Sequence, residues 1–358
     1  MRLIVLFSIL LAMTFFLNYR LNVLPEKNIF FSISLHLEGT PYNQVNNFDR
    51  YKQHLKAINQ FTGEIIAQNP NARFNFELSN TFIQQDLLFG STVFGANKNF
   101  SKVMKSKGHS ILLHADIGGS DETNEQYNQK LQLMLNSFEL LLGEKTRGIS
   151  GICGNNNWIE ALTDNDLKFV TGMVEYCKKS ILRKNLRAED LWITNCDTPG
   201  ATIPPNHHPW DLNVKDCHGI FPELSTKSIR PITLLNSRNW LSNVSLFYPM
   251  KKIRLTPLIA FSNMQLPRIS CLSNYVIGGD SCEEDYEDLI QFENRLLKAL
   301  NIIQDYNYKN NYLSFTLSIG HTYSVEFSND VGRVLSNFID SNNITWQGVD
   351  DSYDLEIR

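Results

Sequence analysis

The sequence predicts an α/β fold, with a parallel sheet or barrel of about seven strands and long loop insertions. Short apolar segments alternate with longer helical patterns from about residue 28 to residue 340. A proline-rich stretch interrupts this alternation once. Strands that alternate with helices form parallel sheets or barrels, because each helix returns the chain to the same end of the sheet. A chain of 358 residues suffices for one large domain or two modest ones.

Five strand–helix units come first. In the segment 72–78, Phe74 and Phe76 share one face while Asn75 and Glu77 share the other, which is the two-residue period of a strand. The helical segments instead repeat apolar residues every three or four positions. The predicted strands are Ile29–Glu38, Ala72–Leu78, Ser110–Ala115, Gly148–Ile152 and Lys168–Thr171. The predicted helices are Asn47–Ala67, Thr81–Leu88 with a further turn near Met104, Asn124–Leu142 and Trp158–Leu162.

The pattern loosens between about residues 176 and 255, where prolines and cysteines gather. This stretch is interpreted as a loop-rich insertion at one end of the barrel. Regular elements then return, and they are the strands Pro257–Ser262 and Leu313–Ile319 and the helices Glu283–Gln304 and Ser324–Ile339. The total of seven strands is one fewer than in the eight-stranded (β/α) barrel.

The N-terminus predicts a targeting segment. Arg2 precedes the apolar run Leu3–Leu17, which is short for a bilayer span but long enough for a signal-peptide core. No small-x-small cleavage motif follows, so a signal peptide and an uncleaved membrane anchor both stay open, with a buried core helix as the weaker alternative. Residues 1–25 are therefore excluded from the fold, and residues 26–358 form the barrel. We expect a secreted, periplasmic or membrane-anchored protein whose domain lies outside the cytoplasm.

The cysteines and the net charge limit which cross-links, metal sites and binding partners are expected. All six cysteines lie in the second half of the chain, and export would permit disulfides. Cys196 with Cys217 and Cys271 with Cys282 are the pairings closest in sequence, while reduced, buried thiols are the alternative. No CxxC pair is present, which argues against a zinc–cysteine site. The net charge of -4 gives no reason to expect nucleic acid as a partner. The sequence does not predict the oligomeric state.

Histidine and acidic side chains gather at the C-terminal ends of the predicted strands. They are His36, Glu38, Glu77, His114, Asp116 and His321. The pairs 36/38 and 114/116 are each two residues apart, so the members of a pair point to the same face. In parallel α/β folds the C-terminal strand ends converge on one mouth, where sites are built. Imidazoles and carboxylates gathered there would be costly without a metal or mutual pairing.

Three segments resemble polysaccharide deacetylases, the NodB-homology family. Residues 108–114 (GHSILLH) are similar to the family's third-strand segment, whose last histidine binds the metal and corresponds to His114. Residues 37–39 fall at the family's TFDDG motif, whose second aspartate is a metal ligand. Residues 314–321 resemble the last strand, which ends in a general-acid histidine, here His321. The resemblance implies a distorted seven-stranded (β/α) barrel, a divalent metal with zinc as first choice, and an acylated glycan as substrate.

The sequence departs from the family pattern at three positions. Leu37 stands where the family has its catalytic-base aspartate, and Gly118 stands where it has the second metal-binding histidine. Glu38 replaces the aspartate ligand. Asp116 is a possible substitute for the missing histidine, because a carboxylate is an acceptable ligand for zinc.

These departures and matches give a set of predicted roles. The predicted metal ligands are His36, Glu38, His114 and Asp116, the preferred base is Glu77, and the general acid is His321. The leading hypothesis is a metal-dependent hydrolase that removes acyl groups from a polysaccharide or other glycan. A non-catalytic carbohydrate-binding barrel is the second hypothesis, and a glycoside hydrolase with paired Glu38 and Glu77 is the third. Ser150 lacks the GxSxG spacing of a nucleophile elbow, which argues against a serine hydrolase.

Overall fold

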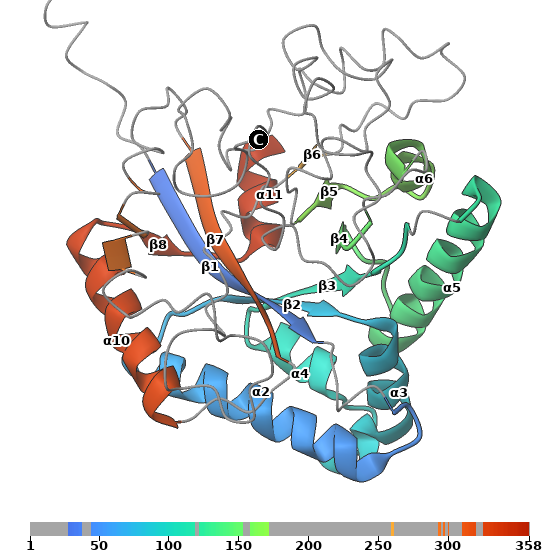
Figure 1. Cartoon of the computed structure of the whole chain (residues 1–358), viewed down its shortest axis with the longest axis horizontal. Coiled ribbons are helices and arrows are strands. Elements are labelled where there is room, and N and C mark those ends of the chain that lie inside the picture. Colours follow the sequence, from blue (N-terminus) through green and yellow to red (C-terminus); the bar gives the residue numbers. More distant parts are fainter. Residues whose placement is uncertain are drawn as a thin grey trace, which may run out of the picture.

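The computed structural model describes residues 28–37, 44–118, 122–152, 158–171, 259–260, 310–319 and 325–357, with 293–294, 296–297 and 300. It confirms the predicted α/β class: the strands run parallel in the order β6-β5-β4-β3-β2-β1-β7, with β8 also paired to β1 (Figure 1). The strands are β1 (Asn28–Leu37), β2 (Phe74–Leu78), β3 (Ser110–His114), β4 (Gly148–Ser150), β5 (Phe169–Val170), β6 (Ile259–Ala260), β7 (Asn310–Ser318) and β8 (Thr345–Trp346). The helices are α2 (Phe48–Gln68), α3 (Asn80–Phe94), α4 (Phe100–Ser106), α5 (Asn124–Leu142), α6 (Trp158–Asp164), α10 (Val325–Ser341) and α11 (Val349–Ile357).

Two elements at the C-terminus were not predicted, namely β8 and α11. The N-terminal segment 1–25, the whole insertion at 176–255 and all six cysteines lie outside the described residues, so those predictions stay predictions. Within the described part of the chain, no helix has the length and apolar character required to cross a membrane.

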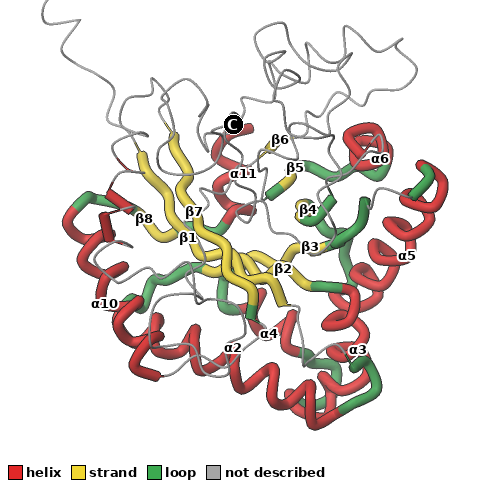
Figure 2. Tube along the Cα trace, viewed as in Figure 1, coloured by secondary structure: helices red, strands yellow, loops and turns green. Residues whose placement is uncertain are grey.

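The two faces of the sheet differ in polarity, as β1 illustrates. Phe31, Ile33 and Leu35 are fully buried in the core between the sheet and its surrounding helices. Ser32 and Ser34 alternate with them and are also fully buried, on the opposite, inward face. Figure 2 shows helices α2, α3, α5 and α10 arranged around the outside of the curled sheet. The outer face is therefore an ordinary apolar core, while the inner face is partly polar.

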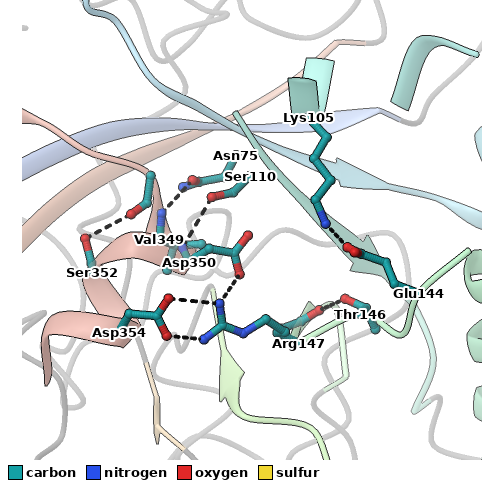
Figure 3. A network of polar contacts seen from close by, with 12 residues as sticks. Asn75, Lys105, Ser110, Glu144, Thr146, Arg147, Val349, Asp350, Ser352 and Asp354 are labelled. Carbon is teal, nitrogen blue, oxygen red and sulfur yellow. Dashed lines mark hydrogen bonds and ion pairs between the residues drawn. The ribbon is translucent and has the colours of Figure 1, made fainter. Parts of the chain in front are cut away.

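Helix α11 packs against the inward face toward the N-terminal ends of the strands. Its Val349 and Tyr353 join an apolar cluster with Phe30, Leu112, Phe169 and Tyr312, which come from four different strands. Arg147 Nη2 lies 2.5 Å from Asp354 Oδ1 (Figure 3). The Arg147 guanidinium also lies over the Tyr353 ring. Helix α11 thus covers the end of the barrel opposite to the C-terminal strand ends.

A network of neutral polar groups adjoins this apolar cluster on the inward face of the sheet. The Asn75 side-chain amide donates hydrogen bonds to Ser32 Oγ and Tyr312 OH, both at 2.8 Å, and to Ser34 Oγ at 3.1 Å. Its carbonyl oxygen accepts from the Val349 backbone N–H at 3.1 Å, which ties α11 to β2 (Figure 3). Every polar atom of the Asn75 side chain is therefore satisfied, as the low dielectric of an interior requires.

Candidate metal centre at the strand ends

Strand pairing brings three of the predicted residues together at the C-terminal rim. His36 of β1 is the direct register partner of Glu77 of β2, and His114 ends the next strand, β3. One ligand atom from each of these three side chains lies within 4.8 Å of the others. His36 Nε2 lies 2.8 Å from Glu77 Oε2, and the imidazoles of His36 and His114 stack with centroids 4.0 Å apart.

Glu77 is the buried anion of this group. Its side chain is fully buried, with Ser150 Oγ donating to Oε2 at 2.5 Å and Thr171 Oγ1 donating to Oε1 at 3.0 Å. Burial raises the pKa of Glu77, but the charge and hydrogen bond of His36, the hydrogen bond of Ser150 and the charge of His114 outweigh it. Together they hold the pKa below its ordinary value. Glu77 is therefore a carboxylate at neutral pH.

The end of β4 gives the group its close packing. Ser150 is the register partner of His114, and Gly151 follows it with a positive φ of 65°. A Cβ atom on Gly151 would lie 2.8 Å from Cε1 of the His114 ring and 2.7 Å from the Asp116 backbone nitrogen. Only glycine accommodates both this backbone conformation and this close approach. The His114 ring consequently lies directly against the backbone that follows Ser150.

The remaining predicted site residues are placed differently. The Asp116 side chain is exposed, and its backbone has a positive φ of 47°. Among the described residues, Asp116 is not part of the three-residue group. Glu38 and His321 lie outside the described residues. The structure thus brings together two predicted ligands, His36 and His114, with the predicted base Glu77.

Two members of the group were missed by the sequence reasoning. Ser150 and Thr171 are 1% and 2% exposed, and both donate to Glu77. The signal that could have identified them is the one that identified the histidines, namely position at the C-terminal end of a short buried strand. Small hydroxyl residues are common at such positions, so the signal carried little weight without the strand pairing.

The donor set suits a divalent metal. Two imidazoles and one carboxylate form the protein ligand set of many catalytic zinc sites, and the same set serves non-haem iron. Tetrahedral zinc bonds of 2.0–2.1 Å would separate ligand atoms by about 3.3 Å. The three donor atoms here lie within 4.8 Å of one another, which exceeds that separation by at most about 1.5 Å. The residues present therefore fit the metal that the sequence resemblance implied.

The comparisons with known proteins give likeness of fold only. No family model matches the chain. No curated protein matches it. A Mycobacterium smegmatis structure assigned as a polysaccharide deacetylase matches with TM-score 0.49 and 9% identity, covering 92% of this chain and 91% of that chain. A Pseudomonas aeruginosa structure with the same assignment matches at 0.47 and 9%, covering 91% and 90%.

A third solved structure, PuuE allantoinase, matches with TM-score 0.45 and 10% identity, covering 91% of this chain and 89% of that chain. Two of these three matching structures thus carry the name of the family that three segments of the sequence resemble. Because none of these scores reaches 0.5 and each identity is near 10%, the likenesses assign no activity to the chain.

Proposed function

We propose that this chain is a metal-dependent hydrolase that removes acyl groups from a polysaccharide or other glycan. The observation that carries the proposal is the convergence of His36, Glu77 and His114 at the C-terminal rim of a parallel barrel, with ligand atoms within 4.8 Å. Sites in such folds are built at this rim. When bound, a divalent ion supplies Lewis acidity toward an acyl carbonyl and acidifies water.

Glu77 suits the role of a ligand better than that of a base. A general base must reach a proton on water or substrate and exchange it during the reaction. Glu77 is fully buried, and both of its carboxylate oxygens already accept hydrogen bonds from Ser150 and Thr171. We therefore assign His36, Glu77 and His114 as ligands. The proton-transfer roles then go to the other predicted site residues, with His321 as the proposed acid and Asp116 or Glu38 as the base.

A test of the metal site starts from chelator-treated, full-length protein titrated with ZnCl₂ in a calorimeter. We expect one zinc per chain for the wild type and none for His114→Ala. His109→Ala is the matched control, because His109 is also a buried imidazole but lies in the outer core against Phe74 and Phe76. Absence of zinc binding by a folded wild-type protein, together with no divalent ion by elemental analysis, would overturn the proposal.

A test of the reaction measures acetate release from a panel of O- and N-acetylated oligosaccharides by the zinc-loaded protein. Release that is lost in His114→Ala and kept in His109→Ala supports the hydrolase. Zinc binding without acetate release from any member of the panel contradicts the catalytic part of the proposal.

The second candidate, a non-catalytic carbohydrate-binding barrel, is favoured by one specific observation. Leu37 is fully buried in the outer apolar core, on the face of β1 opposite to His36. Position 37, where the resembling family has its base, therefore supplies no acid to the site. Oligosaccharide binding without acetate release, measured by calorimetry on the same panel, would favour this candidate.

A further inference from the structure

Ser150 connects two of the proposed ligands directly. Its Oγ lies 2.8 Å from Nδ1 of His114 and donates to Glu77 Oε2 at 2.5 Å. Ser150 is 1% exposed and His114 is 6% exposed, so bulk water competes little for these bonds. A chain of three side chains therefore runs from an imidazole through a hydroxyl to a carboxylate.

The number of protons available to His114, Ser150 and Glu77 decides which group donates in each of these two hydrogen bonds. A serine hydroxyl has one proton to donate, and an ionised carboxylate only accepts. The hydroxyl proton of Ser150 therefore points to Glu77, and the oxygen must accept from His114. This requires a proton on Nδ1 of His114 whether or not the ring is charged, and in the neutral form of the ring Nε2 is then the acceptor nitrogen.

We infer that Ser150 is a positioning residue that selects the Nδ1–H tautomer of His114 and so presents Nε2 as its metal-binding nitrogen. The inference rests on the proposed metal site for its purpose. Metal-binding histidines commonly donate their other ring N–H to a neighbouring acceptor, which orients the ring and raises its basicity. Here the acceptor is a hydroxyl that is itself held by a second ligand, so one residue orients two.

The backbone after Ser150 supports the same role. A Cβ atom on Gly151 would lie 3.0 Å from Nδ1 and 2.8 Å from Cε1 of His114. The ring therefore rests on the chain that follows Ser150, which restricts its rotation. Thr171 offers a contrast, since its hydroxyl donates to the other oxygen of Glu77, Oε1.

The tautomer is measured on chelator-treated, ¹⁵N-labelled full-length protein by long-range proton–nitrogen NMR of the imidazoles at neutral pH. We expect His114 to carry its proton on Nδ1 in the wild type and in Thr171→Val. Ser150→Ala should shift His114 toward the Nε2–H form that neutral histidine ordinarily prefers, and Ser150→Thr should restore Nδ1–H. A wild-type His114 protonated on Nε2 would overturn the inference.

Zinc affinity provides the second readout. We expect Ser150→Ala to weaken zinc binding by about 10- to 100-fold, with Ser150→Thr retaining most of the affinity. An unchanged affinity in folded Ser150→Ala would also count against the positioning role. The two proposals fail separately. If His114 shows the Nδ1–H tautomer but the protein binds no zinc, the metal site is refuted and the effect of Ser150 on the tautomer stands. If the protein binds zinc but His114 shows the Nε2–H tautomer, the metal site stands and the positioning role of Ser150 is refuted.

Discussion

Acidification from pH 7 to pH 5 is expected to weaken the fold through His54, a buried histidine on the inner side of α2. Burial lowers the pKa of His54 from 6.5 to about 4, against the opposing effect of a hydrogen bond to the backbone of Ile319. Its ring packs edge-on against Phe82 at a centroid distance of 5.3 Å. A charged imidazolium at this position would lose its hydration, which is costly in an apolar surrounding.

The sign and size of the effect follow from proton linkage. The unfolded chain takes up a proton on His54 near pH 6.5, whereas the folded chain resists it until about pH 4. Stability is therefore intact above pH 6.5 and is lost as the pH falls toward 4, because the unfolded state binds more protons over that range. The two pKa values correspond to a loss of about 2 kcal/mol in unfolding free energy between pH 7 and pH 5.

The assay is urea unfolding of the wild type and of His54→Leu at both pH values. Leucine removes the titrating group and keeps an apolar side chain of similar size. Any pH-independent effect of the substitution on the unfolding free energy is therefore the same at both pH values. The unfolding free energy of the wild type minus that of His54→Leu should be about 2 kcal/mol smaller at pH 5 than at pH 7. His109, whose pKa burial also lowers to about 4, is present in both proteins and cancels. Equal losses in the two proteins would refute the assignment to His54.

Three further predictions concern the scaffold, all measured by urea unfolding. Gly63→Ala should stabilise α2 by about 0.5–1 kcal/mol, since a Cβ there meets nothing within 4 Å, whereas Gly90→Ala should destabilise by about 1–3 kcal/mol, since its Cβ would lie 2.5 Å from Asn99 Cβ. Asn75→Ala should cost about 2–4 kcal/mol, because it leaves the buried Val349 N–H without its acceptor, and a loss below 1 kcal/mol would contradict the network. Asp354→Asn should cost at most about 1 kcal/mol and less in high salt, because Asp354 and its partner Arg147 are 41% and 38% exposed.

The strand–helix alternation was predictable because the spacing of apolar residues within each continuous segment indicates its secondary structure. The alternating residues of β1 and β2 and the helical spacing of α2 and α5 each lie within one continuous segment. β8 has only two residues, too few to show a period, and is defined by its pairing with Phe30 and Phe31 of β1. α11 is a nine-residue helix placed by its contacts with the inward face of the sheet. Both therefore depend on tertiary contacts that no local pattern reports.

The site was predictable in part for the same reason. Strand parity placed Glu77 on the face opposite to Phe74 and Phe76. The C-terminal positions of His36, Glu77 and His114 on their strands placed all three at the same rim. The direct pairing of His36 with Glu77 depends on the β1–β2 register, which neither segment encodes by itself. Glu77 was consequently interpreted as a base beside the metal rather than as a member of the ligand group.

The interior of the barrel holds two polar clusters of different character, and the difference suggests what each is for. The cluster around Asn75 consists of neutral groups with complete hydrogen bonding, which is enough to anchor α11. The cluster around Glu77 holds a buried carboxylate between two imidazoles. A neutral amide at position 77 could accept from one of Ser150 and Thr171 through its single oxygen, and the other hydroxyl would turn to accept from the amide NH₂. The charge is therefore more than these two hydrogen bonds require, and buried acids whose pKa is shifted by neighbouring charges concentrate at functional sites.

Glu77→Gln separates the two roles. In the presence of chelator we expect the unfolding free energy to change by less than about 1 kcal/mol, because the amide keeps an acceptor and no longer buries a charge. The stabilisation by zinc, about 2.7 kcal/mol for the wild type at 100 times the dissociation constant, should disappear in the variant. A loss of about 3–5 kcal/mol in chelator would instead identify a structural ion pair between Glu77 and its histidines. Such a loss would show that the carboxylate serves the fold, and the case for a metal ligand at position 77 would fail.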